Sequence, residues 1–360
     1  MRREMVRLLD AGASTNVFPG ASACIAYREG KERVYLSATG GLLAPRGDAV
    51  DEKTFYDLAS LTKPVTAVTA LRMAMAGAMD LDEPIGHALS DLRGSAAETV
   101  SLRTLLSHRS GLEAWGGFYL DVPHEPGSGA ARRWIVSEAS RRVSNSSAAR
   151  RCVYSDLGYI IAGELLSRIN KTPLNEAVRE WVTSPLNLED TLFFAGESGH
   201  GSALKRSAPT ERCDWRGRVV RGEVGDENCA ALGGISGHAG LFGTAESVAR
   251  FGVAMLDVHQ GASNFVPKAE FNASLSDPGD GSTWRMGWDT RSKTGSSGGQ
   301  RMSENAFGHL GFTGTSIWCD PERDVVVVLL SNRVHPSRAN EKIRGFRPAF
   351  HDGVLGAFDS

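Results

Sequence analysis

Ser60 and Lys63 form an S-x-x-K pair at the start of a helical pattern that covers residues 60–76. Side chains three residues apart lie on one face of a helix, so the hydroxyl and the amine are predicted to be neighbours in its first turn. A desolvated lysine can take the proton of a serine hydroxyl, or lower the pKa of another base, and the serine can then attack a carbonyl group. The pair therefore predicts acyl transfer through a serine nucleophile.

The same pair has a second interpretation. Serine is a favoured helix cap and lysine is usually a solvated side chain, so a capped surface helix would give the same pattern. A second copy of the spacing occurs at Ser202 and Lys205. The motifs that accompany the pair must therefore decide between the two interpretations.

Tyr154 and Asp156 belong to a Y-S-D triplet that stands where a loop meets an apolar helical pattern, residues 156–169. A phenol in this place can share the proton of a serine nucleophile. A helix cap beside a half-buried tyrosine is the alternative interpretation of the triplet.

Two further triplets compete for a place beside the serine. The triplet H-L-G that begins at His309 leads directly into strand-like residues 315–319 and 325–330. The triplet K-T-G that begins at Lys293 lies in a Gly- and Ser-rich stretch, a composition that favours a flexible turn over a strand. We therefore favour the triplet at His309.

The rest of the sequence predicts the elements that position these residues. Residues 21–27 and 33–38 predict a β-hairpin near the N-terminus, and residues 315–319 and 325–330 predict another near the C-terminus. Apolar residues that recur every three or four positions predict helices between them, at residues 60–76, 130–143, 156–169, 174–182 and 245–256. Strands at both ends with helices between them indicate an α+β fold. Residues 196–243, rich in glycine, serine and charge, are a candidate binding loop.

Composition limits the partners of this chain. Its 360 residues are 41% hydrophobic and 23% charged, which is typical of a globular protein with one large core or two lobes. A formal net charge of −2 gives no basic field for nucleic acid or an anionic membrane, so small molecules are the expected partners. The longest apolar run, residues 325–330, is far shorter than the roughly 20 residues of a membrane span. No signal-peptide pattern is seen, which predicts a cytoplasmic location if the chain is complete.

Metal and disulfide chemistry are not expected. The five cysteines are scattered and lack C-x-x-C spacing, so we interpret them as reduced thiols. His108, His238 and His309 show neither H-E-x-x-H nor a short paired spacing. Neither a metal nor an organic cofactor is therefore predicted.

The order and spacing of the motifs resemble the serine β-lactamase and penicillin-binding-protein superfamily, in particular class C β-lactamases, serine DD-peptidases and family VIII esterases. Residues 105–112 (LLSHRSGL) look like the LLTHTSGL segment of that family, and residues 240–245 (GLFGTA) resemble its GGLxSTA helix entry. The resemblance implies one β-lactamase/transpeptidase-like domain over residues 1–360, with an antiparallel sheet flanked by helices. Its α/β lobe would cover about residues 1–75 and 235–360, and an inserted, mostly helical lobe about residues 76–234.

The resemblance also implies a mechanism. Ser60 would attack a carbonyl group, Lys63 and Tyr154 would share the proton transfers, and the N–H groups of Ser60 and Phe312 would form the oxyanion hole. Water would then hydrolyse the acyl-enzyme. The supporting and substrate-binding residues would be Asp156, His309, Gly311, Phe312 and Thr313.

Asp156 stands where the family usually has asparagine. A carboxylate near Lys63 favours the ammonium form, which raises the pKa of Lys63 and weakens the lysine as a base. The sequence therefore favours Tyr154 as the proton acceptor, with its phenolate stabilised by the lysine cation.

His309 and Leu310 are two further departures from the family pattern. Histidine in place of lysine is cationic only below a pKa of about 6.5, so turnover of anionic substrates is expected to fall as the pH rises through that value. Leucine removes a hydroxyl that would bind a substrate carboxylate, although Thr313 or Thr315 would offer a replacement. These changes favour an esterase or peptidase that acts on an ester, amide or lactam over an efficient β-lactamase, with peptidoglycan-derived substrates among the candidates.

An inactive or weakly active binding protein that keeps the fold is the alternative function. Residues 225–228 are compatible both with a polar turn and with a place in the site, and no role is assigned to them. The sequence predicts no oligomeric state and no particular acyl donor.

Overall fold

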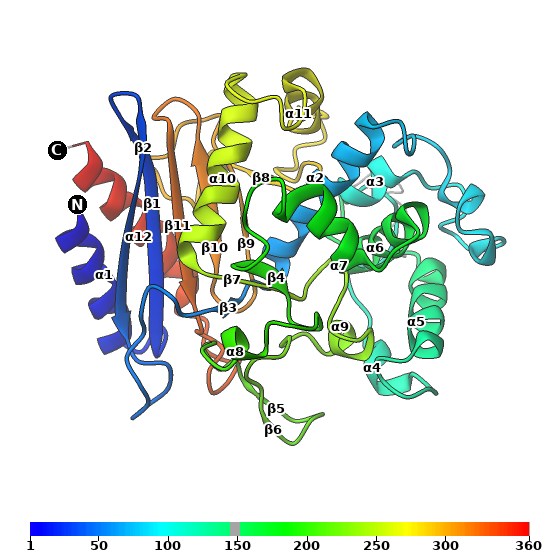
Figure 1. Ribbon diagram of the computed structural model, residues 1–360, viewed down its shortest axis with the longest axis horizontal. Coiled ribbons are helices and arrows are strands. Elements are labelled where there is room, and N and C mark those ends of the chain that lie inside the picture. The colour runs from blue at the N-terminus through cyan, green and yellow to red at the C-terminus, as the bar shows by residue number, and fades with distance from the viewer. Residues whose placement is uncertain (145–151, 360) are drawn as a thin grey trace.

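A six-stranded antiparallel sheet forms one side of the molecule (Figure 1). The computed structural model describes residues 1–144 and 152–359. The N-terminal hairpin of β1 (Gly20–Glu29) and β2 (Glu32–Gly41) pairs through β1 with β11 (Val325–Ser331), which follows β10 (Ser316–Asp320). Both predicted hairpins are therefore confirmed, and the two ends of the chain meet in one sheet.

Strand β11 is apolar from Val325 to Leu330 because both of its faces are buried. Val325, Val327 and Leu329 contribute to one core with the terminal helices α1 (Arg2–Ser14) and α12 (Ile343–Phe358). The alternate residues Val326, Val328 and Leu330 belong to the larger core on the other face, where α10 (Ala245–Gln260) packs. Figure 1 shows these helical layers on either side of the sheet. A strand covered on both faces favours a nearly continuous apolar run.

All five predicted helices are present. They are α2 (Thr62–Met75), α5 (Gly129–Arg141), α6 (Asp156–Asn170), α7 (Leu174–Val178) and α10 (Ala245–Gln260). A 3₁₀ turn, Ala59–Leu61, precedes α2, and a π-helical turn, Arg179–Thr183, follows α7. The sequence had predicted continuous helices at both places, so the serine lies in the 3₁₀ turn and not in the α-helix.

Residues 196–243, which the sequence predicted as a binding loop, contain several short helices and strands. They include α8 (Gly201–Leu204), β5 (Arg212–Cys213), β6 (Arg218–Val219), α9 (Glu227–Ala231) and β7 (Leu241–Gly243). Strand β7 pairs with β3 (Tyr56–Asp57) and β4 (Leu192–Phe194) in a small second sheet. This sheet ends beside the 3₁₀ turn that carries Ser60.

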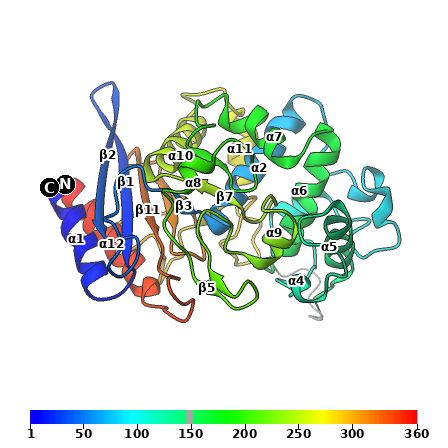
Figure 2. The same cartoon turned by 60° about the horizontal axis from the view of Figure 1, so that its bottom comes forward.

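The remaining elements complete the two sides of the molecule. They are α3 (Leu102–Leu106), α4 (Phe118–Asp121), α11 (Lys268–Ser274), β8 (Asp289–Thr290) and β9 (Phe307–Leu310), with 3₁₀ turns at Ile85–His87 and Ser90–Leu92. Figures 1 and 2 both place α4 to α7 on the side of the molecule away from the terminal helices, where α6 and α7 pack against α2. The lobe boundaries near residues 75 and 235 stay a prediction. None of the helices in the described residues is long and apolar enough to cross a bilayer.

Helix α10 approaches the sheet so closely that residue 252 has no room for a side chain. A Cβ atom on Gly252 would lie 2.8 Å from the side chains of both Ile317 and Val326. We expect Gly252→Ala to lower the free energy of unfolding by about 1–3 kcal/mol, because overpacking outweighs the gain in helix propensity. Gly345→Ala in α12 meets open space and is the matched control, expected to raise it by up to about 1 kcal/mol. Urea denaturation would measure both values, and equal effects of the two variants would contradict the packing argument.

Candidate active site

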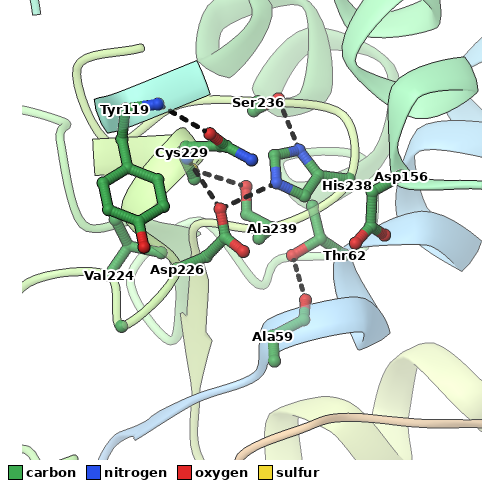
Figure 3. Close-up of polar contacts among 12 residues, drawn as sticks. Ala59, Thr62, Tyr119, Asp156, Val224, Asp226, Cys229, Ser236, His238 and Ala239 are labelled. Carbon is green, nitrogen blue, oxygen red and sulfur yellow. Dashed lines mark hydrogen bonds and ion pairs between the residues drawn. The ribbon is translucent and has the colours of Figure 1, made fainter. Parts of the chain in front are cut away.

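The buried carboxylate of Asp57 fixes the turn that carries Ser60. The Oδ1 atom of Asp57 accepts a bond from the N–H of Ala59 at 2.9 Å, and its Oδ2 atom accepts one from the N–H of Gly225 at 2.6 Å. Burial raises the pKa of Asp57 to about 6, although these two bonds oppose the rise. Ala59 has a φ angle of +48°, in the left-handed region that residues with a Cβ rarely adopt. The strained turn directs the serine toward a cavity, while Thr62 Oγ1 donates to Ala59 O at 2.7 Å (Figure 3).

Lys63 is fully buried, and all of its polar contacts belong to the site. Its Nζ atom donates to Ser60 Oγ at 2.9 Å and to the backbone oxygen of His238 at 3.4 Å, and it lies 2.6 Å from Asp156 Oδ1. Burial lowers the pKa of Lys63, but the charges of Asp156 and Tyr154 and their hydrogen bonds outweigh burial, so the pKa lies above its usual value. The lysine is therefore an ammonium ion at rest, as the sequence argument about Asp156 expected.

Tyr154 packs among rings directly beside this ammonium. Its ring centroid lies 4.8 Å from Lys63 Nζ and 4.5 Å from the rings of both His108 and Trp284. Burial raises the pKa of Tyr154 above its usual value; the charge of Lys63 and hydrogen bonds to Lys63 and Ser60 lower it, and the charge of Asp156 raises it further. The expected phenolate was therefore wrong for the resting protein: the carboxylate that stabilises the ammonium also opposes ionisation of the phenol.

His309 is buried and neutral, which overturns a second expectation. Its Nδ1 atom bonds to the oxygen of Leu310 at 2.8 Å, and within the described residues its Nε2 atom has no hydrogen-bond partner. Burial and repulsion by Lys63 lower the pKa of His309 to about 3. The side chain faces the rings of Trp284 and Tyr154 and does not line the cavity. It therefore cannot supply the pH-dependent cation that the sequence suggested.

The segment after β9 packs tightly against the nucleophile turn. A Cβ atom at Gly311 would collide with Leu58 O at 2.5 Å and with the Thr315 side chain, so only glycine fits there. Thr313 Oγ1 donates to Asp57 O at 2.7 Å, and Thr315 Oγ1 donates to Leu58 O at 3.1 Å. Both hydroxyls therefore support the turn, and the expectation that they would replace the missing hydroxyl at Leu310 was wrong.

A cavity of about 560 Å³ opens in front of Ser60. Five of the predicted site residues besides the serine line it: Tyr154, Asp156, Gly311, Phe312 and Thr313. Lys63 lies behind this wall. Phe312 is 53% exposed, and its backbone oxygen accepts bonds from Arg333 at 2.9 Å and 2.6 Å, which fixes the turn that carries its N–H group.

The competing motif copies lie elsewhere. Ser202 and Lys205 are exposed at α8, and Lys293 is exposed in a loop before β9. None of the three lines the cavity. The structure therefore brings together the motifs that the sequence favoured.

Several cavity residues were not predicted. Trp115 and Trp284 contribute aromatic surface, and Asp226 and His238 contribute a polar wall. Asp226 lies in the segment 225–228, to which no role was assigned. The bond from the N–H of Gly225 to Asp57 places this segment against the Ser60 turn, and this contact shows that the segment belongs to the site. No group of three or more potential His, Cys, Asp or Glu metal ligands occurs in residues 1–144 and 152–359.

An α+β protein with a serine on a strained turn and a buried lysine beside it has the architecture of the serine β-lactamase and penicillin-binding-protein class. The sequence profile of the Beta-lactamase family matches residues 5–347. The class C β-lactamase of Rhodobacter sphaeroides has a similar fold, with a TM-score of 0.70 at 18% identity over 99% of both chains. The chain therefore belongs to the Beta-lactamase family.

Two curated relatives are named as hydrolases. An N-acetylmuramyl-L-alanine amidase of Bacillus subtilis (strain 168) is 29% identical over 327 residues, which are 82% of this chain and 72% of the relative. A putative D-alanyl-D-alanine carboxypeptidase of Salmonella agona (strain SL483) is 26% identical over 328 residues, which are 84% of this chain and 74% of the relative. These names agree with the β-lactamase-related serine hydrolase that the sequence indicated.

The neutral state of His309 has a measurable consequence. Its pKa in the folded protein, about 3, lies below that of an exposed histidine, so the ring is uncharged between about pH 5 and pH 8. We expect the ratio of kcat/KM for p-nitrophenyl succinate, an anionic ester, to that for p-nitrophenyl butyrate to stay constant within about twofold between about pH 5 and pH 8. A ratio that falls steadily as the pH rises would show that His309 is a cation in the working enzyme.

Proposed function

We propose that this protein is a serine hydrolase that cleaves an amide or ester through an acyl-enzyme on Ser60. One observation carries the proposal: Ser60 Oγ lies at the wall of the cavity, 2.9 Å from the Nζ atom of the fully buried Lys63. A serine in such a place has a neighbour that can remove its proton and a space in which a carbonyl group fits.

The proposed first step forms an ester between the substrate and the protein. Lys63 first gives up one proton to solvent water, and the resulting amine takes the proton of Ser60 as Oγ bonds to the carbonyl carbon. The N–H groups of Ser60 and Phe312 stabilise the oxyanion. Lys63 and Tyr154 then pass the proton to the leaving nitrogen or oxygen, and its bond to the carbonyl carbon breaks.

The second step reverses these transfers with water. A water molecule gives one proton to the same basic groups, its oxygen attacks the acyl carbon, and the Oγ–carbon bond breaks as the proton returns to Ser60. The acid is released, and Lys63 takes up one proton from solvent water, which restores the resting protein. This chemistry uses no cofactor.

The charges around the cavity support a substrate without a carboxylate next to the cleaved bond. His309 is neutral, and the hydroxyls of Thr313 and Thr315 are engaged with backbone oxygens. The Arg347 guanidinium donates to the oxygens of Gly311 and Thr315 at 2.6 Å and 3.0 Å. Amides or esters are therefore better candidates than β-lactams or terminal D-alanine peptides. The name of the Bacillus subtilis relative supports peptidoglycan-derived amides among them.

The five cysteines support a reducing compartment. Cys24, Cys213, Cys229 and Cys319 are buried free thiols, and Cys152, partly exposed, is also unpaired. Free thiols persist in the cytoplasm, whereas oxidising compartments favour disulfides. We therefore retain the cytoplasmic location as part of the proposal.

Ser60→Ala tests the nucleophile directly. We expect the wild type to hydrolyse p-nitrophenyl butyrate and N-acetylmuramyl-L-alanine amide, whose alanine carboxylate is blocked, and to turn over a chromogenic cephalosporin slowly, with an acyl adduct visible by intact mass. Ser60→Ala is expected to lose at least about 1000-fold of the activity and all of the adduct, because the attacking atom is gone. Ser202→Ala, which removes the serine of the exposed motif copy, is the matched control and should keep wild-type rates. Absence of both turnover and adduct in the wild type would favour the binding-protein alternative.

Asp156→Asn tests how the charge beside Lys63 sets the working pH. The carboxylate 2.6 Å from Nζ raises the pKa of Lys63, so its removal lowers that pKa and makes the amine available at lower pH. We expect the acidic limb of the kcat/KM profile to move down by about one pH unit or more. The profile of each protein with p-nitrophenyl butyrate would measure the shift. Loss of activity at every pH would instead mean that Asp156 itself accepts a proton during turnover.

A further inference from the structure

Asp226 presents a carboxylate on the cavity wall in a fixed orientation. Its Oδ1 atom accepts a bond from the N–H of Cys229 at 2.7 Å and another from His238 Nε2 at 2.9 Å (Figure 3). The first bond caps the N-terminus of α9. Two donors on one oxygen leave the carboxylate little freedom to rotate.

His238 is itself held on two sides. Its ring is 2% exposed, and Nδ1 bonds to Ser236 Oγ at 2.8 Å. Its backbone oxygen accepts a bond from Lys63 Nζ at 3.4 Å. His238 therefore bonds to the proposed catalytic lysine through its backbone oxygen and to Asp226 through its ring. These two bonds keep Lys63 and Asp226 at a fixed separation.

The second oxygen of Asp226 faces the cavity. Within the described part of the chain Oδ2 has no hydrogen-bond partner. The atom is not fully buried, and the side chain is about a quarter exposed. Figure 3 shows this oxygen pointing away from Cys229 and His238. Burial raises the pKa of Asp226, but the charge and hydrogen bond of His238 outweigh it and lower the pKa to about 2. The oxygen is therefore a charged acceptor with space in front of it.

The cations around the cavity already have partners. Arg338 pairs with Glu211 at 2.6 Å and with Glu227, and Arg344 pairs with Glu341 at 2.8 Å. Arg333 donates to backbone oxygens, and Lys63 is paired with Asp156. Among the residues that the structure describes, no basic side chain bonds to the outer oxygen of Asp226, so a ligand in the cavity is the available source of a donor.

We propose that Asp226 is a specificity-determining residue that accepts a hydrogen bond from an N–H or O–H group of the substrate bound at Ser60. The inference rests on the proposed function, because it requires an acyl group on that serine. A neutral amide or hydroxyl group and an ammonium group share this donor chemistry. Both would be preferred over ligands that carry only acceptors or a carboxylate at the same position.

Boronic acids test the inference because they form a tetrahedral adduct with a nucleophilic serine without turnover. The probes are acetamidomethylboronic acid, which has an amide N–H, and its N-methyl counterpart, which has none. A second pair is 3-aminopropylboronic acid and butylboronic acid, which differ by an ammonium group. Inhibition constants for wild type, Asp226→Asn and Glu341→Gln would be measured against p-nitrophenyl butyrate, with adducts checked by intact mass.

We expect the wild type to bind the donor-bearing member of at least one pair about 10-fold to 100-fold more tightly than its match, as a hydrogen bond to a charged group provides. Asp226→Asn keeps an oxygen for Cys229 and His238 but turns an amide NH₂ group toward the cavity, so its preference should fall to within about threefold. Glu341→Gln removes the same charge from the cavity edge and should retain the wild-type preference. A preference in the amide pair assigns the site to neutral donors, and a preference confined to the amine pair assigns it to cations.

The outcomes separate the two proposals. No boronate adduct and no turnover in the wild type would overturn the hydrolase itself. Adducts without a donor preference in the wild type would overturn the role of Asp226 alone, whatever the variant does. An equal loss of preference in Asp226→Asn and Glu341→Gln would also overturn it, because the effect would then come from the net charge of the cavity.

Discussion

The ammonium group of Lys63 is the constraint on which the rest of the site depends. A fully buried ammonium is stable only when a countercharge and hydrogen-bond acceptors surround it. Asp156 supplies the charge, and Ser60 Oγ and the oxygen of His238 accept two of its N–H groups. These partners come from the turn before α2, the start of α6 and the loop before β7, so satisfying one lysine fixes three segments that are distant in sequence.

Local sequence patterns predicted the helices and strands whose formation depends mainly on residues close to one another in the sequence. The apolar run of β11, the hairpin of β1 and β2 and the amphipathic helices were all recognisable, and so was the spacing that brings Ser60 beside Lys63. Helix α12 was missed because Pro348 and its glycines weaken the helical signal, while packing against the sheet stabilises the helix nonetheless. Family resemblance placed Tyr154 near the lysine, which no local pattern would have done.

Electrostatic states could not be predicted in this way, because they depend on burial and on neighbours from other segments. His309 loses its charge because the fold removes it from water. Tyr154 keeps its proton because burial raises its pKa and the charge of Asp156 opposes that of Lys63. Asp226 belongs to the site only because the neighbouring Gly225 bonds to Asp57 in the Ser60 turn. Sequence alone names the titratable groups, whereas the fold sets their charges.

The pairing of β1 with β11 joins the beginning of the chain to its end, with Ala23 opposite Leu329. A pairing of such high contact order cannot form until the residues of β11 have been synthesised. Arg347, which holds the oxygens of Gly311 and Thr315, comes later still, in α12. The wall that Gly311 and Thr313 form beside Ser60 is thus completed only after these late segments exist. A growing chain that already contains the serine and the lysine still lacks this surface against which a substrate would bind.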